Sequence, residues 1–116
     1  MLRTLLTLAR DNPGAGNAKL AAAIVKKRKV LAFGFNRMKS HPLQKRFGKN
    51  PHAIFLHAEL DAITNAIRRH GEGALAGSTL YIARVRRDGT AALAKPCTGC
   101  EEAIKVFGIE RVEWTR

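Results

Sequence analysis

The sequence predicts an α/β fold of three layers, α/β/α, in which helices cover both faces of a mixed β-sheet. Three observations predict it. The chain has 116 residues, of which 46% are apolar, and this suffices for one hydrophobic core and a single domain over residues 1–116. An amphipathic stretch precedes two strand-like stretches in the first half. Helical and strand-like patterns then alternate through the second half, as they do in α/β proteins.

The first half predicts one helix and one hairpin. Apolar residues recur at helical spacing over 2–9, and turn-forming residues at 11–14 end that segment. Residues 19–25 and 30–35 are apolar stretches that flank the basic tetrad 26–29, which predicts an antiparallel hairpin. The tetrad fits a short charged turn better than a nucleic-acid patch, and both interpretations stay open.

A long exposed loop is predicted over residues 37–53, where basic residues and histidines mix with prolines and a glycine. Its cations offer a site for a phosphate group. We name Arg37, Lys39 and His41 as candidate substrate-binding residues. The alternative for His41, as for His52, is an ordinary surface histidine.

The second half predicts two helices and two strands. Residues 56–67 carry apolar side chains at helical spacing, and Gly71 is placed to end that helix. Residues 78–85 favour a central strand that is covered on both faces. A third helix is predicted over 96–107, and residues 109–114 predict the last strand.

Two separated sequence motifs carry the chemistry. The first is His57-Ala58-Glu59, and the second, which follows the histidine by 40 residues, centres on Pro96-Cys97-Thr98-Gly99-Cys100. One imidazole and two thiolates make three protein ligands for zinc, and a catalytic zinc keeps its fourth position for water. The pattern H-x-E followed by P-C-x-x-C is the signature of zinc-dependent base deaminases.

The spacing within each motif indicates helix starts. Cys97 and Cys100 are three residues apart, so their sulfurs share one side of a first helical turn, where the N-terminal partial charge stabilises thiolates. His57 and Glu59 are two apart and would not share a face inside a helix, so they must also lie at a helix start. Glu59 then reaches the zinc water without ligating the metal. The adjacent Ala58 is a candidate backbone contact for the substrate.

In this interpretation zinc lowers the pKa of its water from about 15.7 toward about 7. Glu59 accepts a proton, and hydroxide attacks the carbon of the base that bears the amine. The same carboxyl group then delivers protons to the ring nitrogen and to the departing ammonia.

Two alternatives for these motifs stay open. A structural zinc site would take His41, His52 or His70 as a fourth ligand, but it leaves Glu59 without a role. A thioredoxin-like redox pair of cysteines leaves both His57 and Glu59 without one.

The net charge and the positions of the cysteines limit the possible class of protein and its possible partners. The formal net charge of +12 favours a phosphorylated or polyanionic partner without naming it. Both cysteines fall in the C-x-x-C motif, which in a reducing compartment indicates a metal or redox site. No segment has the pattern of a secretory signal or a membrane span, so we expect a cytoplasmic protein without membrane contact.

With these motifs the chain resembles the cytidine deaminase-like superfamily, and most closely its deoxycytidylate-deaminase and tRNA-adenosine-deaminase branch, whose first zinc ligand is histidine. Gly34-Phe35-Asn36 is similar to the G-x-N step of that branch, and Thr79-Leu80-Tyr81 resembles its strand before the cysteines. The segment from Pro96 onward, with Gly108-Ile109, follows its usual ending. The likeness covers roughly residues 18–114.

The resemblance implies a cytidine deaminase-like fold and assigns roles to individual residues. It implies that His57, Cys97 and Cys100 hold Zn²⁺. It also implies that Glu59 moves protons and that Asn36 contacts the sugar or base of the substrate. The alternative for Asn36 is a strand-end asparagine that bonds its own backbone.

Two further expectations follow from the resemblance. Asp61 departs from the family pattern, since deoxycytidylate deaminases commonly carry asparagine at that position, and this bears on specificity for a monophosphate. Relatives often continue beyond the strand that follows the cysteine helix, and they are usually oligomers. We therefore expect a homo-oligomer of at least two chains.

The expected reaction is the deamination of a small nucleotide or nucleoside, in its simplest form cytosine to uracil in CMP or dCMP. A deaminase of nucleic acid, acting on tRNA or single-stranded DNA, is the main alternative, and the basicity of the chain favours it. Near the basic loop only Phe47 and Phe55 offer aromatic rings on which a base would stack. A deaminase of a purine or modified base, and a non-catalytic zinc module that binds DNA, are the remaining alternatives.

Overall fold

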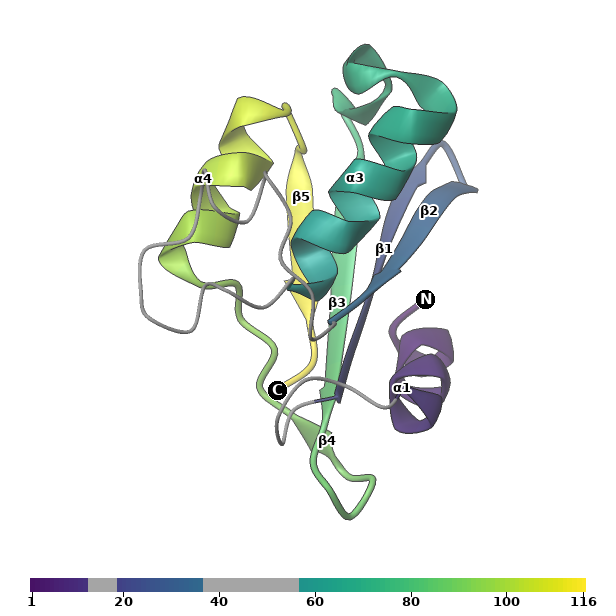
Figure 1. Cartoon of the computed structure of the whole chain (residues 1–116), viewed down its shortest axis with the longest axis vertical. Helices are drawn as coiled ribbons and strands as arrows, with labels where there is room; N and C mark the ends of the chain where they lie inside the picture. The colour runs from purple at the N-terminus through teal and green to yellow at the C-terminus, as the bar shows by residue number, and fades with distance from the viewer. Residues whose placement is uncertain (13–18, 37–56) are drawn as a thin grey trace.

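A mixed β-sheet with helices on both faces forms the described part of the chain (Figure 1). The computed structural model describes residues 1–12, 19–36 and 57–116. In chain order the elements are α1 (Leu2–Asp11), β1 (Lys19–Lys26), β2 (Lys29–Phe35), α3 (Ala58–His70), the 3₁₀ helix η2 (Glu72–Leu75), β3 (Thr79–Val85), β4 (Ala91–Ala92), α4 (Thr98–Val106) and β5 (Arg111–Trp114). No helix in these ranges is both long and apolar enough to cross a membrane.

The central strand β3 pairs with three other strands. On one side it runs antiparallel to β1, which in turn pairs antiparallel with β2. On its other side it pairs in parallel with β5 along Thr79–Ile82 and antiparallel with β4 along Arg84–Val85. The strand order is therefore β2-β1-β3-β4 with β5 beside β3, and the predicted mixed sheet is confirmed.

The two faces of the sheet carry separate hydrophobic cores. Side chains alternate along β1, so Ala21 and Ala23 face α1 while Ala22 and Ile24 face the opposite core. The core on the α1 side contains Leu5, Ala9, Ala21, Ala23, Ala83 and Val85. The opposite core contains residues of α3, α4 and the sheet, among them Leu60, Ile63, Leu80, Ile82, Cys100 and Ala103. The predicted three layers are thus present.

The hairpin between β1 and β2 closes through a tight turn at Lys27 and Arg28. Their φ angles are 50° and 67°, which are the left-handed values that a type I′ turn requires. Lys26 pairs with Lys29 across the turn. The interpretation of the basic tetrad as a charged hairpin turn is confirmed.

α3 approaches β2 closely at Gly34. A Cβ atom at that position would lie 2.5 Å from the carbonyl oxygen of Ala58 and 2.7 Å from the Cα of Ala62. Both contacts are shorter than van der Waals distances, so only glycine lets the first turn of α3 lie this close to the sheet. This close packing sets the position of the residues at the start of α3.

Thr115, just after β5, joins the segments that precede α4 to the sheet. Its backbone N–H donates to the carbonyl oxygen of Ile82 at 3.1 Å, and its hydroxyl donates to the carbonyl oxygen of Ala92 at 2.7 Å. The same hydroxyl oxygen accepts from the N–H of Arg84 at 3.0 Å, and the Thr115 carbonyl accepts from the N–H of Ala94 at 2.9 Å. These bonds anchor the chain immediately before the cysteine motif.

Candidate active site

The N-terminal ends of α3 and α4 meet at one place and carry the predicted metal ligands. His57 is the N-cap residue of α3, and its carbonyl oxygen accepts from the N–H of Asp61 at 3.0 Å. Cys97 is the N-cap residue of α4, and its carbonyl oxygen accepts from the N–H of Glu101 at 2.9 Å. The prediction that both motifs lie at helix starts is confirmed.

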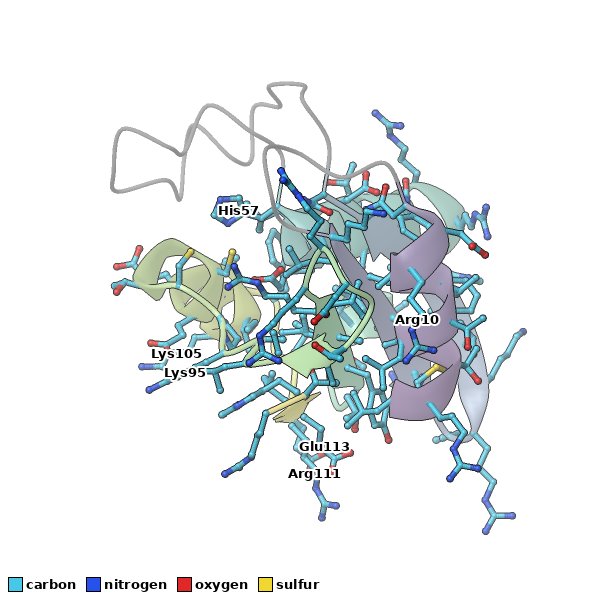
Figure 2. The ribbon with its side chains drawn as sticks, turned by 90° about the horizontal axis from the view of Figure 1, so that it is seen from below. Arg10, His57, Lys95, Lys105, Arg111 and Glu113 are labelled. Carbon is cyan, nitrogen blue, oxygen red and sulfur yellow. The ribbon has the colours of Figure 1, made fainter. Side chains whose placement is uncertain are left out.

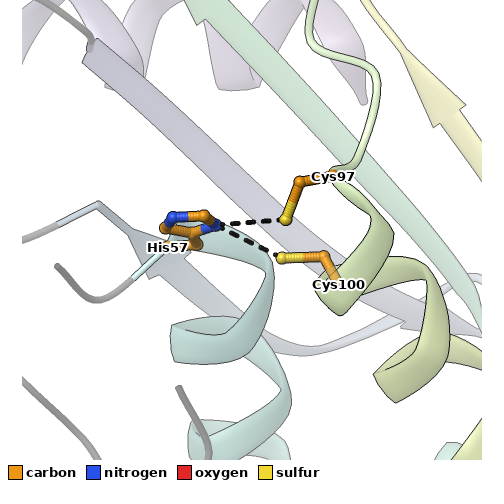
Figure 3. Close-up of side chains that lie close together, drawn as sticks. All are labelled: His57, Cys97 and Cys100. Carbon is orange, nitrogen blue, oxygen red and sulfur yellow. Dashed lines mark hydrogen bonds between the residues drawn. The ribbon is translucent and has the colours of Figure 1, made fainter. Parts of the chain in front are cut away.

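His57, Cys97 and Cys100 form a compact group of three donor atoms (Figure 3). Nδ1 of His57 lies 3.6 Å from the Cys97 sulfur and 3.4 Å from the Cys100 sulfur. A tetrahedral zinc with ordinary bond lengths separates a nitrogen and a sulfur ligand by about 3.6 Å. All three donor atoms lie within 4.8 Å of one another, so their chemistry and spacing fit a zinc ion.

The two cysteines differ in protonation because they interact with each other. The Cys97 sulfur accepts hydrogen bonds from Cys100 and from His57, and these lower the pKa of Cys97 to about 4. The same hydrogen bond, together with burial, raises the pKa of Cys100. The hydrogen bond with Cys97 raises the pKa of His57. The group is therefore electron-rich at the Cys97 sulfur, and a metal ion would have to displace the proton of Cys100.

Glu59 interacts with Cys100, His57 and Cys97 and is almost fully buried, with 4% of its surface exposed. Burial raises the pKa of Glu59, since a charged carboxylate loses its hydration there. Within the described ranges, its Oε1 atom is buried and has no hydrogen-bond partner. A buried carboxyl oxygen without a hydrogen-bond partner lowers the stability of the folded protein unless another group bonds it. Such an atom is suited to accept and release a proton.

Asn36, at the end of β2, is buried and firmly held. Its Oδ1 accepts from the side-chain nitrogen of Asn12 at 2.7 Å and from the backbone N–H of Leu20 at 2.9 Å. The preceding residue, Phe35, donates its N–H to the carboxylate of Asp61 in α3 at 2.9 Å. Asn36 is thus fixed to α1, β1 and, through Phe35, to the helix that carries Glu59.

Of the other predicted substrate-binding residues, the structure describes only Ala58. Ala58 is buried as the first residue of α3, where its N–H belongs to the helix-start groups that lack intrahelical partners. Arg37, Lys39 and His41 lie outside the described residues, as does His52.

His70 does not join the donor group. It ends α3, and a helix of 13 residues extends over about 20 Å, which separates His70 from His57. Its Nε2 atom lies 3.2 Å from the carbonyl oxygen of Leu31 and donates to it. Of the three histidines considered as a fourth structural ligand, His70 is therefore excluded.

One polar residue near the site was not singled out by its sequence pattern. Asn12 ends α1 as its C-cap residue and is 9% exposed. Its side-chain nitrogen donates to Asn36 and also to the carbonyl oxygen of Leu20 at 3.0 Å. The sequence marks Asn12 only as part of a helix-ending cluster, because its partner Asn36 is distant along the chain.

Basic side chains of the described residues are distributed over several elements. Figure 2 shows Arg10 on α1 on the other side of the view from Lys95 and Lys105, and Arg111 extends from β5. All four are exposed. Nε of Arg10 donates to the carbonyl oxygen of Gly89 at 3.0 Å, which ties the turn between β3 and β4 to α1.

Comparison with solved structures shows the same fold in several deaminases. The dCMP deaminase from the cyanophage S-TIM5, in apo form, matches with a TM-score of 0.66 and 21% sequence identity, over 97% of this chain and 77% of that chain. The guanine deaminase from Bacillus subtilis matches with a TM-score of 0.62 and 26% identity, over 97% of this chain and 60% of that chain. A structure from work on tRNA:A34 deaminases matches with a TM-score of 0.52 and 25% identity, over 82% of this chain and 58% of that chain.

Sequence comparison places the chain in a family. A search of the curated proteins finds no matching sequence. The family profile described as the cytidine and deoxycytidylate deaminase zinc-binding region matches residues 1–115, a range that contains both motifs and every described element. The chain therefore belongs to the cytidine and deoxycytidylate deaminase family.

Proposed function

We propose that this protein is a zinc-dependent hydrolytic deaminase of a small nucleotide or nucleoside, and that its simplest reaction converts cytosine to uracil in CMP or dCMP. The observation that carries the proposal is the buried carboxyl group of Glu59 beside three donor atoms at zinc-ligand spacing. A structural metal site has no use for such a carboxyl group. The family membership supports the same reaction class.

Each residue of the site has a defined task in this proposal. His57, Cys97 and Cys100 bind zinc, which when bound makes water acidic enough to supply the nucleophile. Glu59 takes one proton from the water and passes it to the ring nitrogen of the base. It then transfers the second proton to the departing amine, so that base-NH₂ and water become base=O and ammonia. A raised pKa suits a carboxyl group that must both accept and donate.

Substrate contacts come from residues around this centre. Asn36 is proposed to bind the sugar or base, and the backbone of Ala58 to bind the base. Arg37, Lys39 and His41 are proposed to bind a phosphate, which fits the net charge of +12. The protein is further proposed to be a cytoplasmic homo-oligomer.

The test is a panel assay of ammonia release by the zinc-loaded protein. The panel contains cytosine, adenine and guanine as nucleosides, as nucleotides and in single-stranded oligonucleotides. The proposal expects turnover of a cytosine nucleotide or nucleoside. Release of ammonia from guanine or adenine compounds only would move the proposal to a purine, and release from none of them would refute it.

A second candidate is a deaminase of nucleic acid, which the charge and the 25% identity to the tRNA:A34 deaminase structure favour. The two candidates differ in salt dependence. A protein that neutralises several phosphates loses affinity steeply as salt rises, whereas an enzyme for single nucleotides changes little. The measurement is KM for dCMP and for an oligonucleotide at two salt concentrations.

A further inference from the structure

α3 runs antiparallel to β2, so the C-terminal end of the helix and the turn between β1 and β2 lie at the same end of the molecule (Figure 1). Two hydrogen bonds fix this arrangement. Near the start of α3, the carboxylate of Asp61 accepts from the N–H of Phe35, the last residue of β2, at 2.9 Å. At the end of α3, His70 donates to the carbonyl oxygen of Leu31, close to the start of β2, at 3.2 Å.

Basic side chains gather at this end of the molecule. Nζ of Lys26 donates to the carbonyl oxygen of Ala74 at 3.3 Å, which joins the hairpin to η2. The last turn of α3 carries Arg68 and Arg69 beside the turn of the hairpin. This surface, the cationic end, consists of Lys26, Lys27, Arg28, Lys29, Arg68 and Arg69. All of these residues are exposed except Lys26, which is half-buried.

Carboxylates do not neutralise the cationic end. Every Asp and Glu of the chain lies within residues 1–12, 19–36 and 57–116. In the segments 26–29 and 68–75, Glu72 is the one acidic residue. No basic side chain of this surface makes an ion pair with a carboxylate of the described residues. Like charges that lie close together repel each other, and an anion that binds among them relieves this repulsion.

The chemistry of this surface fits a phosphate backbone better than a membrane or an apolar protein partner. The large exposed apolar side chains of the described residues are Met1, Leu93 and Val106, and all three lie outside the cationic end. Membrane-surface helices and protein interfaces combine polar residues with apolar anchors. Phosphate contacts need cations and N–H donors, and an arginine fork binds two phosphate oxygens at once.

We propose that the cationic end is a docking surface for the phosphate backbone of a nucleic acid, and that it is separate from the active site. α3 extends over about 20 Å, with His57 at one end and this surface at the other. One strand of a duplex advances about 3.4 Å per nucleotide, so about six nucleotides span this distance. A mononucleotide at the zinc ligands therefore does not reach the cationic end, and docking is independent of the base that is deaminated.

The experiment measures the binding of a fluorescent single-stranded oligonucleotide of mixed sequence to the zinc-loaded protein, by anisotropy at several salt concentrations. The hairpin variant combines Lys27→Asn with Arg28→Gly. Asn-Gly is a preferred dipeptide of the type I′ turn, so this variant loses charge but keeps the turn. The helix variant combines Arg68→Gln with Arg69→Gln, because glutamine is a good helix former.

The matched control variant combines Lys105→Gln with Arg111→Gln. Both residues are exposed and lie on α4 and β5, outside the cationic end. The control therefore loses the same amount of positive charge as each test variant. Thermal unfolding shows whether all three variants are folded, and kcat/KM for dCMP reports on the active site.

The hairpin and helix variants should each bind the oligonucleotide about tenfold more weakly at 0.1 M salt. The slope of log K against log salt should become shallower by about 0.7 for each phosphate contact that is lost. The control should change the dissociation constant by less than about twofold, because its charges lie away from the docked backbone. All three variants should keep the kcat/KM of the unaltered protein for dCMP.

Unchanged binding in both test variants, or equal weakening in the control, would overturn the inference. A fall in kcat/KM for dCMP in the test variants would contradict the separation from the active site. Binding to vesicles of phosphatidylcholine and phosphatidylserine, without binding to the oligonucleotide, would assign the surface to a membrane instead. Failure of the proposed function has a different signature, which is no ammonia release from any member of the panel, whereas anisotropy requires no turnover.

Discussion

The Cys100 sulfur lies 3.4 Å from Nδ1 of His57, although 43 residues separate the two in the chain. Each belongs to the first turn or N-cap of a different helix, and both helices pack on the same face of the sheet. The fold thus brings the two motifs together. Five predictions concern the proposed zinc binding, its proton coupling, the support of the site and the carboxyl group of Glu59.

Removal of one sulfur should abolish tight zinc binding. In Cys100→Ala only two of the three donor atoms remain, so the zinc content should fall from about one ion per chain to a small fraction. Thr98→Ala is the control, because Thr98 is exposed and lies between the two cysteines. Metal analysis of the purified variants is the measurement. A full zinc content in Cys100→Ala would contradict the assignment.

Zinc affinity should increase with pH between about 6 and 8. The pKa values of Cys100 and His57 are raised, so zinc must displace their protons, and acid favours the protons. Each proton released should change the affinity about tenfold per pH unit. Cys97, with a pKa of about 4, is already deprotonated and adds nothing to this slope. Competition with a chromophoric chelator at several pH values measures the slope, and a flat profile would be inconsistent with it.

Asp61→Ala should destabilise the protein by about 1–3 kcal/mol. The substitution leaves the N–H of Phe35 without the carboxylate oxygen that it bonds at 2.9 Å, and Asp61 is only 5% exposed. Asp61→Asn keeps an acceptor at this place and should cost less. Denaturant unfolding of the two variants measures the difference. Equal losses of unfolding free energy in the two variants would show that the hydrogen bond to Phe35 does not stabilise the protein.

Gly34→Ala should disturb the packing of α3 on β2 and destabilise the protein by about 2–3 kcal/mol. The added Cβ would lie 2.5 Å from the Ala58 carbonyl oxygen, which belongs to the rigid helix backbone. The control is Gly73→Ala, where a Cβ meets nothing within 4 Å. Thermal unfolding of the two variants is the measurement. A Gly34→Ala protein as stable as the control would mean that the helix does not need this close approach.

Much of this site was predictable from local spacing. The interval between Cys97 and Cys100 fits one helical turn, and the interval between His57 and Glu59 excludes a helix interior, so both motifs had to lie at helix starts. The larger elements were predictable for a similar reason, because their apolar periodicity extends over many residues.

Other features have no local signal. β4 has only two residues, Ala91 and Ala92, and two residues cannot show a strand periodicity. The contact of Asn12 with Asn36 joins residues from different elements, and only the folded sheet brings them together. Only Gly71 separates the short helix η2 from α3, so the sequence pattern of η2 is hard to distinguish from the end of α3. Such features depend on tertiary packing, which overrides local preference.

The most direct test of the central claim compares metal content and turnover in Glu59→Gln. The amide has nearly the shape of the carboxyl group but cannot take up a proton from water, while His57, Cys97 and Cys100 are unchanged. The account predicts that this variant binds as much zinc as the unaltered protein and releases ammonia about 10²–10⁴-fold more slowly. Full zinc content together with undiminished ammonia release would contradict the role of Glu59 in proton transfer.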